Sequence, residues 1–193
     1  TRLTKIFRQE ESSEIVINAH KINSGQHFQI SNENGMYHFA TSESATAAKW
    51  IVDEVFPRIN KKFDIPYEEI QVLCPMYKGT CGVDALNYSL REKLNPDNGQ
   101  ESVNCLGRIF RIGDRVMQIK NDYGLKVFNG DTGYVVDIQK VSGLSKVTIQ
   151  YEDAGSLRMV EYDMDQLTNV VLAYAITIHK SQGCEYPGII VAL

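Results

Sequence analysis

The stretch Ala173-Tyr-Ala-Ile-Thr-Ile-His-Lys-Ser-Gln-Gly-Cys-Glu185 decides the fold of this chain. It begins with apolar residues typical of a buried strand, changes to a run of hydrogen-bond donors, and is followed by a second apolar run, Ile189-Ile-Val191. A polar loop between two buried strands is typical of an α/β sheet, and such loops lie where ligands bind. Thr, Lys, Ser and Gln suit phosphate and sugar oxygens, and Gly183 permits a close backbone approach. The stretch therefore predicts a contact with nucleic acid or a nucleotide.

The composition is ordinary for a globular chain, with 193 residues, 43% hydrophobic and 23% charged. A net charge of −4 excludes a generally basic coat for nucleic acid, so any such contact must come from local groups. The four cysteines are widely spaced, which disfavours zinc and a disulfide scaffold. With no long apolar run and no signal peptide, we expect a cytoplasmic protein without a membrane partner. The ends, at Thr1 and Leu193, indicate a piece of a longer polypeptide.

Strands and helices alternate over the first half of the sequence, which favours a mostly parallel sheet covered by helices on both faces. The expected strands are 3–7, 36–40 and 70–74. The first expected helix runs from Ser12 or Ser13 to Gly25, with Ile15, Val16, Ala19 and Ile22 inward. A second helix begins at Thr41 or Ser42, with its end disturbed by Pro57, and a third spans 81–94.

A different rhythm follows, with short β-like runs and turns. The candidate strands are 115–120, 133–139, 146–151 and 157–162, with turns at 129–131 and 153–155. Several short strands in so short a stretch predict a small β barrel. We therefore expect an α/β lobe formed by residues 1–106 and 168–193, with a β-barrel module at 107–167 inserted into it.

Phe7-Arg8-Gln9 follows the first expected strand and precedes a helix. An arginine there projects from the sheet edge toward an anion, and Arg is favoured for bidentate phosphate contacts and for finger roles acting on a neighbouring site. The alternative is an ordinary surface arginine in a loop. From spacing alone, the surface interpretation is the stronger.

The segment Cys74-Pro-Met-Tyr-Lys-Gly-Thr-Cys-Gly82 follows a buried strand and opens a helix. Backbone N–H groups at a helix start bind phosphate, and Lys78 and Thr80 add donors beside Pro75 and Gly79. The segment is not a P-loop, because Gly-x-x-x-x-Gly-Lys-Ser/Thr occurs nowhere in the chain. An ordinary strand-to-helix turn remains an equal alternative.

In the opening stretch, the candidate nucleic-acid contacts are Thr177, His179, Lys180, Ser181 and Gln182. Glu185 is placed to accept hydrogen bonds from ribose hydroxyls. A lone histidine is more often structural, so ligand contact and a structural loop stay equally open.

Asp53-Glu54 imitates an acidic Mg²⁺ pair, but it lies in a helical period with Ala48, Ile51 and Val55 rather than at the end of a strand. The other histidines have no metal-ligand spacing, so we expect no metal site.

In the expected β module, Tyr123, Phe128 and Tyr134 lie near Lys120 and Lys126. Aromatic rings beside basic groups stack bases and hold phosphates, and they equally fill a small barrel's core. The core is favoured for Tyr134 and Val127. Phe128 and Asn129 stay open, since their turn is a candidate exposed tip, and Asn129 is counted among the candidate DNA contacts.

Taken together, these stretches resemble the second motor lobe of RecD-type helicases, superfamily 1 enzymes of the 5′→3′ class that include the exodeoxyribonuclease V alpha chain. The matching segments, in order, are Leu3-Thr-Lys-Ile-Phe-Arg-Gln9, Leu73-Cys-Pro-Met-Tyr-Lys-Gly79 with Gly82 and Leu86-Asn87, Phe110-Arg-Ile-Gly-Asp-Arg-Val-Met-Gln-Ile-Lys-Asn121, Val127-Phe-Asn-Gly-Asp-Thr-Gly133, and Leu172-Ala-Tyr-Ala-Ile-Thr-Ile-His-Lys-Ser-Gln-Gly183. The resemblance implies a RecA-like lobe of the P-loop NTPase type carrying an inserted SH3-like β barrel.

The resemblance also implies roles. Arg8 is similar to the arginine that reaches the γ-phosphate of ATP held on the first lobe, and Phe7 occupies a position that packs near the adenine. Gln9 is counted with them as a nucleotide-binding residue. Glu185 is similar to the acid that contacts the nucleotide ribose. Thr177, His179 and Lys180 match the motif that joins single-stranded DNA to the ATP cleft. The 75–82 segment is similar to the turn that holds the DNA backbone, with the barrel covering the strand.

The P-loop, the Mg²⁺ acid and the remaining first-lobe motifs are absent from the sequence. The resemblance therefore implies half of an ATP site, inactive alone, with ATP and Mg²⁺ used only together with the first motor lobe of the same polypeptide. Subunits of a nuclease complex are further implied partners. The main alternative is a non-enzymatic SH3-like module that binds protein or nucleic acid on an α/β scaffold. A relaxase-linked or phage-type helicase of the same superfamily is a third possibility.

Overall fold

The structure, a computed structural model, describes residues 13–33, 35–141, 143–153 and 155–193. The expected strand at 3–7 and the candidate residues Phe7, Arg8 and Gln9 lie outside the described residues. The chain divides into two compact units, residues 1–42 and 43–193, which are considered separately.

In the first unit, α1 (Glu14–Asn23) begins after Ser13 and ends at Ser24, followed by Gly25 with a φ of +68°. These are the predicted boundaries. The predicted inward face is wrong in part, because Val16 and Asn18 are buried whereas Ile15 and Ile22 are 46% and 54% exposed. The strand expected at 36–40 is also wrong. This segment has no strand assignment, since no described strand of the unit lies beside it to complete a ladder.

The second unit begins with a continuous helical segment formed by α2 (Ser44–Trp50), the π-helical turn η1 (Ile51–Val55) and α3 (Phe56–Phe63). The expectation that Pro57 disturbs the end of this helix is wrong, because Pro57 stands in the first turn of α3 and the helix continues to Phe63. The wider π turn before it accommodates a residue without an N–H donor. Ile51 and Val52 are buried, as the helical period predicted.

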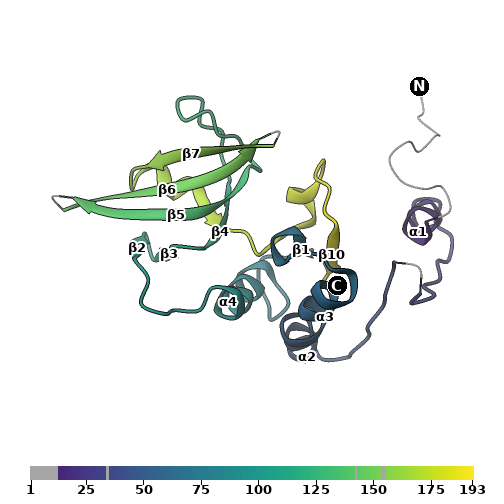
Figure 1. Cartoon of the computed structure of the whole chain (residues 1–193). Coiled ribbons are helices and arrows are strands. Elements are labelled where there is room, and N and C mark those ends of the chain that lie inside the picture. Colours follow the sequence, from purple (N-terminus) through teal and green to yellow (C-terminus); the bar gives the residue numbers. More distant parts are fainter. Residues whose placement is uncertain (1–12, 34, 142, 154) are drawn as a thin grey trace, which may run out of the picture. The chain divides into compact units, whose positions relative to one another are not determined.

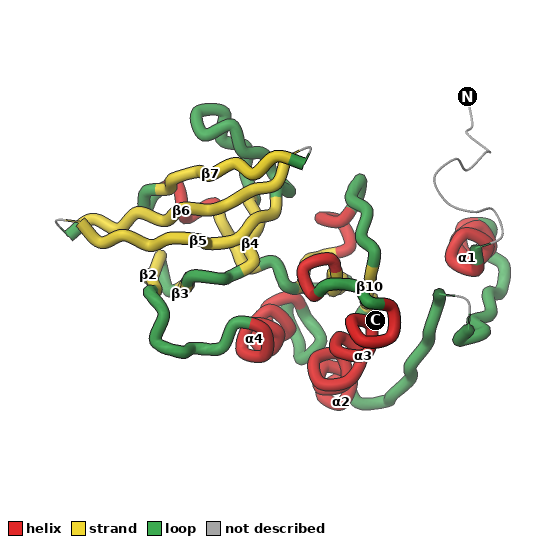
Figure 2. Tube along the Cα trace, in the orientation of Figure 1, coloured by secondary structure: helices red, strands yellow, loops and turns green. Residues whose placement is uncertain are grey.

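Three parallel strands form the central sheet of this unit, in the order β10-β1-β9. The 3-10 turn η2 (Tyr67–Glu69) leads into β1 (Ile70–Cys74), which is buried along its whole length between β9 (Ala175–Thr177) and β10 (Gly188–Val191). Figure 2 shows β10 close to the C-terminal end of the chain. The two apolar runs that flank the polar loop are therefore neighbours of the same central strand. The prediction of an α/β lobe is confirmed.

Alternate residues of β1 face different layers. Ile70, Val72 and Cys74 pack with residues of η1, α3 and α4 (Val83–Leu94), and Figure 1 shows these helices gathered on one side of β1. On the other face, Leu73 packs with Met117 and Ile176. Because Met117 belongs to the inserted module, the module itself covers part of the sheet.

The inserted module is a five-stranded antiparallel sheet in the order β7-β6-β5-β4-β8, with a separate β2-β3 hairpin. The strands of the module are β2 (Ser102–Cys105), β3 (Arg108–Arg111), β4 (Arg115–Gln118), β5 (Thr132–Val141), β6 (Leu144–Asp153), β7 (Ser156–Tyr162) and β8 (Val170–Leu172), with η3 (Gln166–Asn169) before β8. All four predicted strands are confirmed. Among the described strands, no pairing joins the edges β7 and β8 into a closed ring. The predicted domain boundaries stay a prediction.

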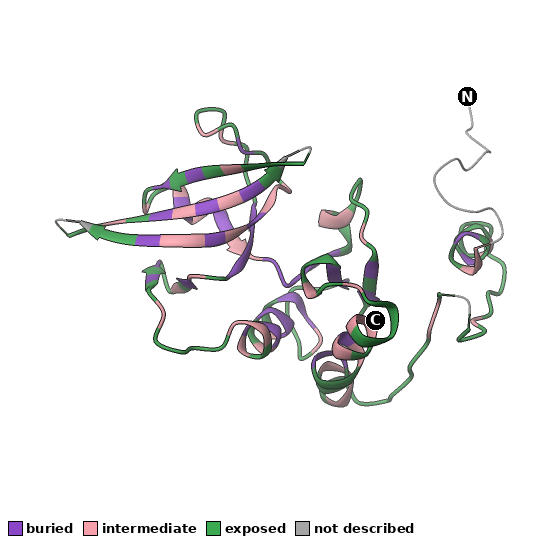
Figure 3. Ribbon diagram, viewed as in Figure 1, coloured by how far each residue is buried: buried purple, intermediate pink, exposed green. Residues whose placement is uncertain are grey.

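Burial alternates along the long strands of this sheet (Figure 3), so that one face forms a core. Val127 is fully buried in that core, as predicted, and Tyr134 is half-buried. Burial is the main cause that raises the pKa of Tyr134 above its ordinary value.

Candidate nucleic-acid interface

The candidate residues outside the first unit gather where β1 and β9 end. Cys74 and Thr177 are register partners in the parallel pair β1–β9, so the turn that starts at Pro75 and the loop that follows Thr177 begin side by side. The carboxyl ends of parallel strands are where α/β sheets bind ligands. The structure thus brings two sequence-predicted segments, far apart in the chain, to one edge of the sheet.

The loop after β9 is built by its own side chains. The buried Thr177 hydroxyl accepts a hydrogen bond from the Lys180 backbone N–H at 3.3 Å and caps the 3-10 turn η4 (Ile178–Ser181). Ser181 Oγ donates to the Ile178 carbonyl at 2.8 Å. The hydroxyls of Thr177 and Ser181 therefore hold the turn in shape.

The polar side chains that this loop turns to solvent include those of His179, Gln182 and Glu185, beside the exposed Ile178 and Cys184, while Lys180 is half-buried. Gly183 has a φ of +87°, a conformation that residues with a Cβ rarely adopt, so the glycine is required for the chain to reverse before Glu185. The loop therefore presents an imidazole, an amide and a carboxylate on a fixed backbone.

A second contact at this edge comes from the inserted module. Lys180 Nζ donates to Asn129 Oδ1 at 2.5 Å, across 51 positions of sequence. Asn129 is held in turn because its backbone N–H donates to Asn121 Oδ1 at 2.8 Å. Both Lys180 and Asn129 are predicted DNA contacts, but no local pattern indicates that their side chains touch.

The turn after β1 exposes Pro75, Lys78, Gly79 and Thr80 to solvent. The Thr80 hydroxyl bonds with Ser44 Oγ at 2.7 Å, which ties the turn to the start of α2. The solvent-facing side chains are consistent with a contact surface.

The backbone of this turn corrects one expectation. The first N–H groups of α4, from Val83 and Asp84, donate to the carbonyls of Met76 and Tyr77 at 3.0 and 3.1 Å. These two groups are therefore already paired within the turn. An anion at this position would have to be held by side chains such as Lys78 rather than by these two backbone donors.

Two side chains of α4 fix the neighbouring elements. Asn87 forms a pair of hydrogen bonds with the Ala175 backbone, donating to its carbonyl at 2.8 Å and accepting from its N–H at 2.9 Å. This pair holds the outer edge of β9 just before Thr177. Asn87 was not predicted as a positioning residue, because nothing in its local sequence indicates that its side chain contacts β9.

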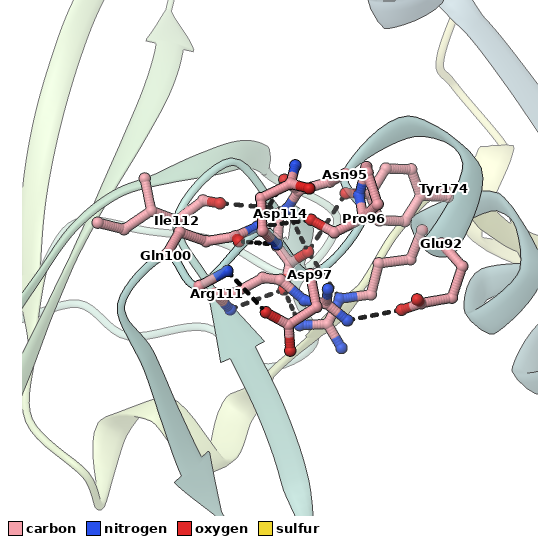
Figure 4. Close-up of polar contacts among 12 residues, drawn as sticks. Glu92, Asn95, Pro96, Asp97, Gln100, Arg111, Ile112, Asp114 and Tyr174 are labelled. Carbon is pink, nitrogen blue, oxygen red and sulfur yellow. Dashed lines mark hydrogen bonds and ion pairs between the residues drawn. The ribbon is translucent and has the colours of Figure 1, made fainter.

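The second α4 side chain, Arg91, joins the lobe to the module through a buried network (Figure 4). Arg91 Nε and Nη2 donate to the two oxygens of Asp114 at 2.8 and 2.6 Å. Asp114 also accepts from Asn95 Nδ2 at 2.9 Å, from the Arg111 backbone N–H at 2.9 Å and from the Tyr174 hydroxyl at 3.3 Å. Burial, followed by the Asp114 charge, raises the pKa of Tyr174 above its ordinary value.

The described residues contain no group of three or more His, Cys, Asp or Glu side chains able to hold a metal ion. Within the same ranges, no helix has the length and apolar character needed to cross a membrane. Asp53 and Glu54 belong to the π-helical turn, and Asp53 pairs with Lys93 at 3.4 Å.

Residues 86–151 match the family described as the ATP-dependent RecD-like DNA helicase SH3 domain. The chain is 39% identical over 117 residues to an ATP-dependent RecD2 DNA helicase of Deinococcus radiodurans, an alignment that covers 61% of this chain and 15% of that protein. It is 34% identical over 126 residues to the RecD subunit of the RecBCD enzyme of Mycolicibacterium smegmatis, covering 65% of this chain and 20% of that protein. The chain thus spans about a fifth or less of these relatives.

Solved structures agree at the level of the fold. A structure of two coordinating Pif1 helicases at forked double-stranded DNA has a TM-score of 0.55 and 22% identity, covering 98% of this chain and 42% of that chain. A Bacteroides Pif1 helicase in complex with ADP-AlF3 and single-stranded DNA has a TM-score of 0.52 and 21% identity, covering 98% and 44%. The fold of the chain is therefore similar to that of these Pif1 helicases over nearly its whole length, and residues 86–151 match a helicase SH3 domain.

Proposed function

We propose that this chain, a relative of the RecD-type superfamily 1 DNA helicases, serves as part of an ATP-dependent helicase that moves along single-stranded DNA. The observation that carries the proposal is the convergence of the turn after β1, the loop after β9 and the Asn129 turn of the module at one edge of the sheet. The relatives are named as ATP-dependent helicases or as a subunit of a nuclease complex.

In this proposal the DNA backbone lies along the carboxyl edge of the sheet. Lys78 and His179, both exposed, and Lys180 supply the donors for phosphate oxygens, with Thr80, Gln182 and the backbone at Gly79 nearby in the same two segments. Pro75 and Ser181 shape the two turns rather than carry charge. Since few phosphates are neutralised, binding is expected to be weak and salt-sensitive.

The nucleotide side of the proposal rests on residues that the resemblance singles out. Arg8 would reach the γ-phosphate of ATP and Phe7 would lie beside the base, with Gln9 as a further nucleotide contact. Glu185 would accept hydrogen bonds from the ribose hydroxyls. Glu185 suits this task because it is exposed on the loop that Gly183 reverses. ATP supplies the energy of the cycle when it is bound between this lobe and the first motor lobe of the same polypeptide, and Mg²⁺ would be held by acids of that first lobe.

Directional movement then follows from the mutual motion of two lobes. Closure of the lobes tightens one grip on the backbone and opening releases it, so that alternating grip moves the strand in one direction. The contribution of the described residues is the second grip, in which the Lys180–Asn129 contact keeps the module above the loop while the lobe moves.

The test is ATP hydrolysis by the polypeptide that carries this chain, measured with and without single-stranded DNA. We expect DNA-stimulated hydrolysis, loss of turnover with retained ATP binding in Arg8→Ala, and weaker DNA binding in Lys180→Ala with a salt slope lower by about one. Lys140→Ala, an exposed lysine of β5, is the matched control. DNA binding without any ATPase activity would favour the non-enzymatic module, and wild-type turnover in Arg8→Ala would refute the finger role.

A further inference from the structure

Two exposed aromatic rings meet on the loop between β4 and β5. The Tyr123 and Phe128 rings lie edge to face with centroids 6.2 Å apart and planes at 74°. Tyr123 is 77% exposed and Phe128 is 46% exposed. Contiguous exposed aromatic surface of this kind marks a binding site more often than isolated exposed side chains do. The rings do not fill the core of the module, so of the two interpretations left open for Phe128 the exposed tip holds.

We propose that Tyr123 and Phe128 form a stacking site for an unpaired base of single-stranded DNA. The inference rests on the proposed function and deepens it, because it adds a site that reads the base rather than the backbone. Aromatic rings bind bases of any identity through their faces, so the site would be tolerant of sequence.

The loop that carries the rings is held in shape by hydrogen bonds and by packing against the core. Asp122 and Val127 pair through reciprocal backbone hydrogen bonds of 2.8 and 3.0 Å and close the turn that contains Tyr123. Val127 is fully buried and Leu125 packs against the same core. Arg158 Nη1 donates to the Leu125 carbonyl at 3.2 Å. A fixed loop loses little conformational entropy when a base binds to it.

Charges near the rings favour a nucleic acid over a neutral partner. Lys120 and Lys126 are exposed on the same loop, and among the described residues neither of them is held in an ion pair. The two acids of the loop are turned toward its backbone, since Asp122 accepts from the Leu125 N–H and Asp131 from the Phe128 N–H. The loop therefore offers cationic side chains at its surface while its carboxylates stay engaged.

The contact of Asn129 with Lys180 joins this loop to the edge of the sheet. Asn129 follows Phe128 directly, and Asn121, which holds the Asn129 backbone, lies two positions before Tyr123. A strand whose phosphates lie against Lys180 would thus have its bases within reach of the aromatic pair. One strand would contact the lobe by its backbone and the module by its bases.

The test is binding of a fluorescein-labelled oligothymidylate to the polypeptide that carries this chain, followed by anisotropy at several salt concentrations. A second oligonucleotide replaces the thymidines with abasic residues. We expect the Tyr123→Ala/Phe128→Ala double variant to bind oligothymidylate about tenfold more weakly with an unchanged salt slope. The conservative variants Tyr123→Phe and Phe128→Trp keep a ring and should retain the affinity, and Tyr88→Ala, an exposed tyrosine of α4, is the control.

The abasic oligonucleotide tests the inference with the wild-type protein alone, so that it does not depend on the folding of any variant. Wild-type affinity for it should fall by about the same factor, and the double variant should no longer distinguish the two oligonucleotides. Equal wild-type affinity for both would overturn the stacking site. If Lys180→Ala weakens binding while the double variant does not, the stacking site is wrong and the proposed function stands. If the wild type binds neither oligonucleotide, the proposed function fails as well.

Discussion

Removal of the Asp114 carboxylate is expected to be one of the most destabilising single changes in the described part of the chain. Asp114 is fully buried, and the Arg91 side chain that it pairs with is only 8% exposed. In Asp114→Ala the guanidinium would remain buried without a counter-charge, and the Asn95 amide and Tyr174 hydroxyl would each lose an acceptor. A buried ion pair broken on one side costs about 3–5 kcal/mol.

The magnitude is set by burial rather than by the number of contacts. The Lys93–Asp53 pair has side chains that are 48% and 42% exposed, so Asp53→Ala should cost about 0–1 kcal/mol. In a double variant, Arg91→Met with Asp114→Leu, the unpaired charge disappears together with its partner. Its cost should therefore be smaller than that of Asp114→Ala alone.

The assay is urea unfolding at neutral pH, followed by far-ultraviolet circular dichroism, with thermal melting as a second measurement. We expect the urea concentration at the unfolding midpoint of Asp114→Ala to lie well below those of the wild type and of Asp53→Ala. The melting temperature of Asp114→Ala should fall by on the order of 10 °C. The reasoning is refuted if Asp114→Ala costs less than the surface control, or if removing both charges costs more than removing one.

Three further predictions follow from the geometry. Gly82→Ala should destabilise the unit by about 1–3 kcal/mol and weaken DNA binding, because an added Cβ would lie 2.5 Å from the carbonyl oxygens of Tyr77 and Lys78. A melting temperature and a DNA affinity equal to those of the wild type would contradict this prediction. Tyr162→Phe should lower the free energy of unfolding by about 1–3 kcal/mol, and Tyr151→Phe by less. The reason is that the Tyr162 hydroxyl bonds with both the Tyr151 hydroxyl, at 2.7 Å, and Gln118 Oε1, at 3.1 Å. Urea unfolding that ranks the two variants in the opposite order would speak against this. Burial and then the neighbouring Cys81 raise the pKa of the Cys74 thiol from 9.0 to about 11. Because this thiol ionises at a lower pH in the unfolded state, the free energy of unfolding should fall as the pH rises from about 9 to 11. An equally steep fall in a Cys74→Val variant would exclude this cause.

Much of the fold was predictable because its signals are local. The periods of 70–74, 83–94 and the four predicted module strands are regular, and turn residues separate them. The β2-β3 hairpin was missed because its turn places Leu106 at a φ of +51°, where leucine is uncommon and gives no turn signal. The continuation of the helix through Pro57 was missed because a π turn depends on packing against the sheet rather than on a local residue preference.

The candidate site was predictable in its members but not in its contacts. Lys180 and Asn129 were singled out separately, by a motif and by a turn, and only the fold brings their side chains together. Asn87 and Asp114 carried no signal of their positioning roles, because each acts on a segment remote in sequence. Hydrogen-bond partners of this kind follow from the topology, which single-residue preferences do not contain.

The first and last strands of the five-stranded sheet in the module, β4 and β8, lie next to each other. Val116 and Leu172 are register partners in β4 and β8, and the Ala173 N–H donates to the Arg115 carbonyl at 2.9 Å. Adjacent strands are separated by only about 5 Å. The two ends of the segment between β4 and β8 are therefore held about one strand spacing apart, whatever the length of that segment. A segment of different length could therefore replace the residues between β4 and β8 at little entropic cost to the surrounding sheet.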